Sequence, residues 1–233
     1  MGFYGFGIDR TYWLVLIGAV LCLLASGLVN STMKKYSKVS NAYRMSGADA
    51  ARRILDAEGL HYVRVEAIAR GDHYDPTSQS VRLSVENYKG TSVTAIAVAA
   101  HECGHAIQHA KGYVPIKIRS SLVPVANLGS TLGIPLIFLG MLLSFNQVLI
   151  QIGIIGFALA VLFQLVTLPV EFNASSRALA KISQHGFLTR DEIDGGKKVL
   201  FAAALTYVAA AASSILQLLR LILISGGGRR RGD

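Results

Sequence analysis

Two histidines and a glutamate within residues 99–109 have the types and spacing of a metal-dependent hydrolytic centre. The pattern is His101-Glu102-Cys103-Gly104-His105, or His-Glu-x-x-His. On a helix, histidines four residues apart project from the same face, about 5–6 Å from each other, so both imidazoles can reach one Zn²⁺. Glu102 follows the first histidine and is placed to accept a proton from a water molecule that the zinc activates. The pattern therefore predicts a zinc site with Glu102 as its base.

The His-Glu-x-x-His pattern also has a simpler explanation that involves no metal. It arises by chance in unrelated proteins, and two histidines on an apolar helix can be hydrogen-bonded core residues. The preceding residues 92–100 are mostly apolar, uncharged and free of helix breakers, which predicts a buried helix. Burying an ionisable cluster is costly unless a metal or a partner compensates for it. This cost favours the zinc reading.

The composition indicates a membrane protein. Of the 233 residues, 52% are hydrophobic and only 16% are charged, and the mean hydropathy is +0.45. These values differ from those of soluble domains. The net charge of +9 comes from basic residues in loops beside apolar runs, with no basic stripe interleaved with aromatics, so we do not expect nucleic-acid binding. Two cysteines, Cys22 and Cys103, do not make a disulfide framework and fit a reducing or lipid environment.

Four apolar runs are long enough to cross a bilayer. They cover residues 12–29, 122–143, 148–170 and 197–224. Positive charge follows the first run and does not precede it, so we expect a retained transmembrane helix and not a secretory signal peptide. A very short segment separates the second run from the third, which predicts a tight helical hairpin.

Lysine and arginine set the expected orientation. Four basic residues follow the first run: Lys34, Lys35, Lys38 and Arg44. The positive-inside rule then places the N-terminus outside and residues 31–120 in the cytoplasm. We therefore expect a multi-pass protein of the cell membrane with its catalytic site on the cytoplasmic side. The last run is predicted to span the membrane, but Gln217, Arg220 and the basic tail also allow a helix that packs on the cytoplasmic domain or lies in the interface.

Glu171 is the expected third zinc ligand. Two membrane crossings separate it from His105, and an even number of crossings returns the chain to the same side. The alternative is an interfacial carboxylate paired with Arg177. His109 is the rival ligand, but it lies about 12 Å along a continuous helix from His101. One metal with bond lengths of about 2.1 Å cannot bind both of these together with His105.

Short elements precede the histidine helix. Residues 46–60 are predicted to form a helix that Ser46 caps and Gly59 ends. Residues 62–66 and 80–85 alternate as strands do, and we expect them to form an antiparallel pair. An exposed edge of this pair could hold an extended peptide by strand addition. A purely structural hairpin is the alternative.

Several segments together carry a family resemblance. They are 72–76 (Asp-His-Tyr-Asp-Pro), 81–84 (Val-Arg-Leu-Ser), 99–109, 168–175 (Leu-Pro-Val-Glu-Phe-Asn-Ala-Ser) and 205–210 (Leu-Thr-Tyr-Val-Ala-Ala). This combination resembles the YugP-like neutral zinc metallopeptidases of bacterial membranes, from about residue 46 to 223. The resemblance implies a membrane-integrated zinc peptidase, similar in outline to the HtpX-like and prenyl-protein endopeptidases. In that class, two helix histidines and a distant glutamate hold the metal.

Two residues depart from the family pattern. Cys103 stands where a small aliphatic residue, usually valine, is expected, and Asn173 stands where aspartate is expected. Cys103 is two positions after His101 and should point away from the metal on a regular helix. Asn173 can still orient a ligand by hydrogen bonding but carries no charge. Neither departure removes a proposed ligand.

The expected architecture is a mainly α membrane protein with about four transmembrane helices. A small cytoplasmic α+β domain, zincin-like and of the gluzincin type, carries a β-hairpin before the His-Glu-x-x-His helix. The expected segments are an N-terminal transmembrane helix (1–30), a cytoplasmic part with the zinc helix (31–120), a transmembrane hairpin (121–170), a cytoplasmic segment with the third ligand (171–198), a fourth transmembrane or membrane-packed helix (199–225) and a basic tail (226–233).

The predicted function is zinc-dependent hydrolysis of peptide bonds in membrane proteins or membrane-associated peptides at the cytoplasmic face. His101, His105 and Glu171 bind Zn²⁺, Glu102 is the catalytic base, and Tyr207, His185 and His73 are candidate oxyanion donors. The expected partners are the peptide substrate and the lipid bilayer. A second copy of the chain or another membrane protein remains an open partner. The alternative function is a non-catalytic membrane scaffold or adaptor with a structural zinc site.

Overall fold

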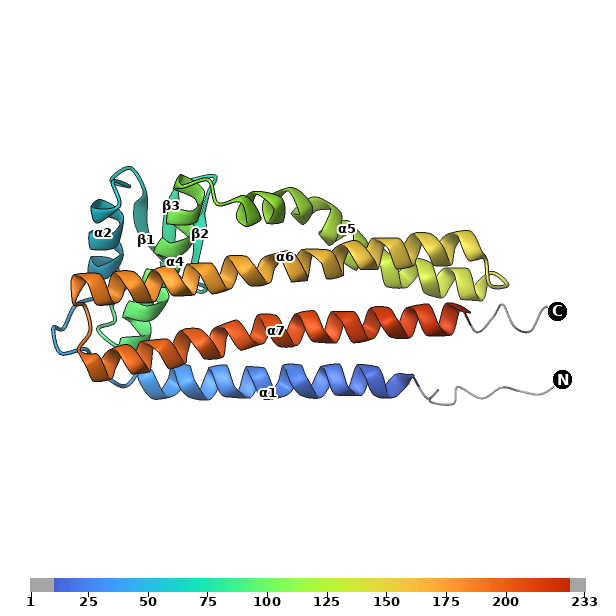
Figure 1. Ribbon diagram of the computed structural model, residues 1–233, viewed down its shortest axis with the longest axis horizontal. Helices are drawn as coiled ribbons and strands as arrows, with labels where there is room; N and C mark the ends of the chain where they lie inside the picture. Colours follow the sequence, from blue (N-terminus) through green and yellow to red (C-terminus); the bar gives the residue numbers. More distant parts are fainter. Residues whose placement is uncertain (1–10, 227–233) are drawn as a thin grey trace. The chain divides into compact units, whose positions relative to one another are not determined.

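The computed structural model describes residues 11–226 (Figure 1). Its elements are α1 (Tyr12–Tyr36), α2 (Gly47–Ala57), β1 (Arg64–Ile68), β2 (His73–Asp75), β3 (Ser80–Ser84), α3 (Val85–Lys89), α4 (Val93–Ala110), α5 (Val114–Leu142), α6 (Gln147–His185) and α7 (Arg190–Gly226). The fold is therefore mainly helical with one small sheet, as expected. The first ten residues of the predicted N-terminal segment and residues 227–233 of the predicted basic tail lie outside the described residues.

Four helices, α1, α5, α6 and α7, are long and apolar enough to cross a membrane, which agrees with the four predicted runs. Their bounds differ from those of the apolar runs. The helix α6 continues past Pro169 and Glu171 to His185, although the apolar run ends at Val170. Among the residues that follow, up to His185, are three alanines and single leucine, lysine, arginine and glutamine residues, which favour helix whether or not they are surrounded by lipid, and no glycine or proline interrupts them. Glu171 therefore lies within a helix and not in a loop after it.

The chain divides into two compact units, which we describe separately. Among the described residues, one comprises 11–24, 119–166 and 207–226, and the other comprises 25–118 and 167–206. In the first unit, α5 and the start of α6 form the tight hairpin that the sequence predicts. A Cβ added at Gly129 would lie 2.1 Å from the carbonyl oxygen of Gly156, so the two helix backbones approach as closely as only glycine permits.

The second unit holds the sheet and α2, α3 and α4, together with parts of the long helices. Ser46 caps α2 as predicted: it accepts a hydrogen bond from the Asp49 backbone, and the Asp49 side chain accepts one in return from the Ser46 backbone. Gly59 follows the helix with φ +74°. The helix α2 packs against α4, and the core between them and the sheet includes Ile54 and Ile96, both fully buried.

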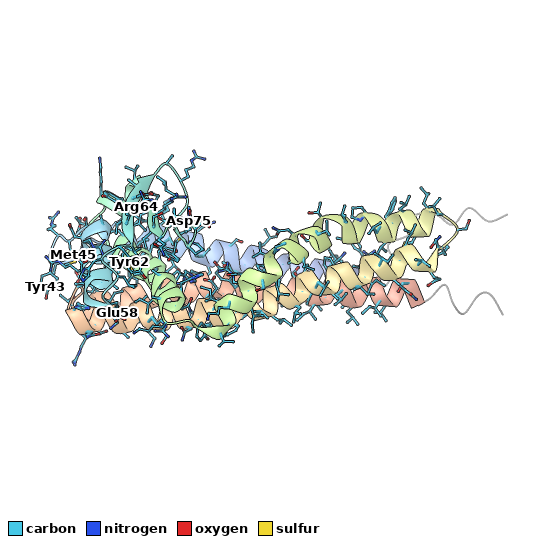
Figure 2. All side chains as sticks on the ribbon, turned by 90° about the horizontal axis from the view of Figure 1, so that it is seen from above. Tyr43, Met45, Glu58, Tyr62, Arg64 and Asp75 are labelled. Carbon is cyan, nitrogen blue, oxygen red and sulfur yellow. The ribbon has the colours of Figure 1, made fainter. Side chains whose placement is uncertain are left out.

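The sheet corrects one expectation. Residues 62–66 and 80–85 were expected to pair antiparallel, but β1 runs parallel to β3, and the strand order is β1-β3-β2. The chain reverses twice between them, and the short strand β2, absent from the sequence prediction, forms the antiparallel hairpin with β3. Arg64 of β1 and Asp75 of β2 both pair with Ser80 of the central strand β3. Figure 2 labels Arg64 and Asp75.

Candidate metal centre

Two helices of the second unit bring three potential ligands together. His101 and His105 lie on α4, and Glu171 lies on α6. The Nε2 atoms of the two histidines are 3.2 Å apart, and Oε2 of Glu171 lies 3.3 Å from Nε2 of His101 and 3.6 Å from Nε2 of His105. All three ligand atoms lie within 4.8 Å of one another. The structure thus brings together the three residues that the sequence nominates as ligands.

The spacing of these atoms fits a zinc ion. In a tetrahedral site with bonds of about 2.0–2.1 Å, ligand atoms are about 3.3–3.4 Å apart. The three observed separations of 3.2, 3.3 and 3.6 Å bracket that value. Two imidazole nitrogens and one carboxylate oxygen are also the donor set of many catalytic zinc sites, which leave one position for water or substrate.

The two carboxylates of the centre are shielded from solvent. Glu171 is 2% exposed and Glu102, the proposed base, is 7% exposed. Burial lowers the pKa of His105, but its hydrogen bond with Glu171 and the negative charges of Glu102 and Glu171 outweigh this, and the pKa is raised. The surroundings of His105 therefore favour a positive charge, which a bound cation would supply.

Gln108 sets the orientation of one ligand. Its amide nitrogen donates to the carbonyl oxygen of Val170 at 2.8 Å and to Oδ1 of Asn173 at 3.0 Å. A carbonyl only accepts, so this bond fixes the amide, and Oε1 of Gln108 must be the atom 3.0 Å from Nδ1 of His105. The proton of neutral His105 then resides on Nδ1, and Nε2 presents its lone pair to the metal.

Ser175 has the matching role at the other histidine. Its hydroxyl lies 3.2 Å from Nδ1 of His101, where it can accept the ring proton. The sequence reading did not nominate Gln108 or Ser175. For Gln108 the sequence held a signal, because a polar residue three positions after His105 on a mostly apolar helix shares the helix face of that histidine. For Ser175, four residues after Glu171, the signal appears only once α6 is known to continue through both.

The two helices meet at a position without a side chain. A Cβ added at Gly104 would lie 2.6 Å from the carbonyl oxygen of Ala174 and 3.1 Å from its Cα. Gly104 therefore allows the backbones of α4 and α6 to approach closely beside the ligands. This contact brings Glu171 within reach of the two histidines.

The departures from the family pattern do not disturb the ligands. Cys103 is fully buried, and its thiol contacts the carbonyl oxygen of Ala51 in α2, so it points away from the ligands as expected. Burial raises the pKa of this thiol far above its ordinary value, and the group stays neutral. Asn173 keeps an orienting function, because its Oδ1 accepts from both Gln108 and Nε of Arg177.

The structure forms neither of the two alternatives considered for the third ligand, a Glu171–Arg177 ion pair or a ligand position for His109. Arg177 bonds to Asn173 and makes no ion pair with Glu171. His109, the rival ligand, packs its ring against Tyr74 of β2, with 5.5 Å between ring centroids, and does not join the ligand cluster.

The three candidate oxyanion donors lie in different places. His185 ends α6, about 21 Å along the helix axis from Glu171, and stacks on Phe187, so it does not serve this centre. His73 is exposed on β2 and faces away from α4, since its neighbour Tyr74 points toward α4. Tyr207 belongs to the other unit, and its role stays a prediction.

Comparison with known proteins identifies the family of this chain. A family model described as "Putative neutral zinc metallopeptidase" matches residues 11–226. A curated relative, "Putative membrane protease YugP" of Bacillus subtilis (strain 168), is 52% identical over 181 residues, which are 76% of this chain and 80% of that protein. No solved structure shows a significant match. The resemblance drawn from the sequence is confirmed: the chain belongs to the neutral zinc metallopeptidase family.

Proposed function

We propose that the protein is a membrane-embedded zinc metalloendopeptidase that hydrolyses peptide bonds of membrane proteins or membrane-associated peptides at the cytoplasmic face. The observation that carries the proposal is the convergence of His101, His105 and Glu171 beside the buried carboxylate of Glu102. The second unit, in which a short sheet accompanies the ligand-bearing helix, then acts as a zincin-like catalytic domain.

The residues divide the chemistry between them. A Zn²⁺ held by the three ligands supplies Lewis acidity to the substrate carbonyl and the attacking water. Glu102 accepts the proton of that water and passes it to the leaving amine. Within residues 11–226 its carboxylate makes no hydrogen bond or ion pair, so no protein donor competes for the site where the proton is received. Gln108 and Ser175 keep the histidine rings in the orientation that leaves Nε2 free.

The scaffold alternative has less support. Structural zinc sites usually have four protein ligands and no open position. The cluster holds three ligand residues among the part of the chain that the structure describes, and neither Cys103 nor His109 joins them. A structural site also has no use for a buried, unengaged carboxylate next to its first ligand.

Charge supports the proposed side of the membrane, and the sheet supports the proposed substrate. Basic residues follow the first apolar run, and the positive-inside rule then favours a cytoplasmic location for the catalytic unit. The strand β2 lies at the edge of the sheet, and its Tyr74 contacts His109 on α4. An extended peptide added to this edge would run beside the metal helix, which suits an endopeptidase.

The test uses the full chain in detergent, supplied with zinc and with casein or a membrane peptide. We expect the Glu102→Gln variant to keep its zinc and to hydrolyse about 10²- to 10⁴-fold more slowly than the native chain. Undiminished hydrolysis by that variant would contradict the mechanism. Bound zinc without hydrolysis of any peptide by the native chain would favour the scaffold.

A further inference from the structure

A cavity in the unit that holds the candidate metal centre has the character of a lipid site. It has a volume of about 440 Å³ and lies between the end of α1 and the start of the apolar part of α7. Its walls combine two lysines, Lys35 and Lys198, with Thr32 and the apolar side chains of Leu28 and Phe201. None of these residues takes part in the metal centre. The cavity is therefore a separate feature that the proposed hydrolysis does not use.

The two lysines give the cavity a net positive charge. Both are exposed, and neither forms an ion pair or a side-chain hydrogen bond with residues 11–226. The ammonium of Lys35 lies 5.4 Å from the centre of the Tyr36 ring, which also lines the cavity. No acidic side chain is among the lining residues. An anion is the ligand that this charge would attract.

The cavity lies where both helices change from apolar to basic. On α1, the uncharged run through Leu28 gives way to Lys34 and Lys35, and on α7, Lys197 and Lys198 directly precede the last apolar run. In a membrane-spanning helix, this change marks the level of the lipid headgroups. Because Lys35 and Lys198 line one cavity, the two changes occur at the same level.

Close packing holds the two helices in place around the cavity. A Cβ added at Gly195 would lie 2.7 Å from Cε1 of Tyr36 and 3.3 Å from Cγ1 of Val93. The ring of Tyr36 therefore lies directly on the α7 backbone, at the point where α4 begins. Tyr36, which lines the cavity, is thus fixed by its close contact with Gly195. The shape of the cavity therefore does not depend on flexible side chains alone.

We propose that this cavity binds one anionic phospholipid of the surrounding membrane. Its phosphate lies between the ammonium groups of Lys35 and Lys198 and accepts from the hydroxyl of Thr32. One acyl chain runs along Leu28 and Phe201, which are 44% and 59% exposed. A free phosphate would gain nothing from these apolar walls, whereas a lipid fills both halves of the cavity.

The test is lipid binding by the full chain in detergent, followed by native mass spectrometry with phosphatidylglycerol and phosphatidylcholine as the probes. We expect one phosphatidylglycerol to bind in preference to phosphatidylcholine. The double variant Lys35→Gln/Lys198→Gln should bind phosphatidylglycerol roughly tenfold or more weakly. The control Lys34→Gln/Lys197→Gln removes the same charge from the adjacent positions and should bind as the native chain does.

Further measurements distinguish specific lipid binding from the binding of a soluble anion and from a nonspecific effect of the positive charges. Equal weakening in both double variants, or no preference over phosphatidylcholine, would overturn the proposal. Glycerol 3-phosphate, which has no acyl chain, should not displace the bound lipid at equal concentration; displacement would show that a soluble phosphate is the ligand and would also overturn it. Phe201→Ser keeps both lysines and should still weaken binding, because it removes part of the acyl-chain wall.

Discussion

The helices α4 and α6 both supply residues of the candidate metal centre, but they do so by different means. The two histidines of α4 are one helical turn apart, so their separation follows from local geometry alone. Glu171 of α6 reaches the same point only because the two helices pack together at Gly104 and Ala174. The helix α6 also supplies Ser175 and the carbonyl of Val170, which orient both histidines directly or through Gln108. The contrast shows that local helix geometry in α4 is enough to pair the two histidines. A complete site also needs the packing of α6, which adds the third ligand candidate and the groups that orient the histidines.

Among substitutions that keep all three candidate ligands, Gly104→Ala should lower the rate of hydrolysis most, because it disturbs the packing of α4 against α6. The new methyl group would overlap the backbone of Ala174, and α4 and α6 would have to move apart. A misplacement of about 1 Å at a catalytic site costs about 10²-fold in rate, and we expect a loss of that size in hydrolysis. Gly27→Ala is the matched control, because a methyl group at Gly27 meets nothing within 4 Å. Equal activity of the two variants would show that the close approach at Gly104 is not needed.

Gln108→Leu should have the next largest effect. It removes the acceptor for Nδ1 of His105 and the bond to Val170 while keeping a side chain of similar size. Loss of a group that orients a metal ligand typically costs 10- to 100-fold in metal affinity, and we expect about that loss for zinc. Competition with a chelator measures it. Gln184→Leu, an exposed position near the end of α6, is the control, and an affinity of Gln108→Leu equal to that of the control would refute the orienting role.

Glu58→Gln should have the smallest effect and should act on stability. Glu58, which is labelled in Figure 2, follows α2. It pairs with Lys111 at the end of α4 at 2.7 Å and with Lys181 on α6 at 2.5 Å. Its bonds to Lys111 and Lys181 lower its pKa. We expect a loss of about 1 kcal/mol and a fall in melting temperature of about 2–4 °C at neutral pH.

The pH dependence of that loss has a definite sign. The pKa of Glu58 is lower in the folded state, so the pairs contribute fully above the unfolded value of about 4.3 and progressively less as the pH falls through the folded value. The difference in melting temperature between the native chain and Glu58→Gln should therefore shrink below about pH 4. Glu86→Gln, which removes a carboxylate that has no ion pair within residues 11–226, should show no such change. A difference that persists in acid would mean that Glu58 does not stabilise through its charge.

The same contrast between local and long-range geometry explains what the sequence could predict. The spacing of His101 and His105 fixes their shared face, and the Ser46 cap and the four long apolar helices follow from residue types within a few positions. Counting membrane crossings, which requires no knowledge of packing, also nominated Glu171, and the structure places this residue beside the two histidines. These features depend on local chemistry or on chain direction alone.

Features that depend on packing were less accessible. The parallel pairing of β1 and β3 depends on the three-residue strand β2, which is too short to give a strand pattern in the sequence. The orienting contact of Gln108 joins residues 62 positions apart in the chain. In the sequence, nothing distinguishes Gly104 from any other residue between the two histidines. Its importance becomes clear only from its contact with the backbone of Ala174 in the structure.

The most direct test of the account is the zinc content of the Glu171→Ala variant, measured on the purified full chain beside the native chain and Glu86→Ala. We predict one zinc per chain in the native protein and in Glu86→Ala, and loss of the zinc from Glu171→Ala, because two histidines from α4 alone do not hold the ion. Full zinc occupancy in Glu171→Ala would contradict the account, since the third ligand would then not come from Glu171 of α6.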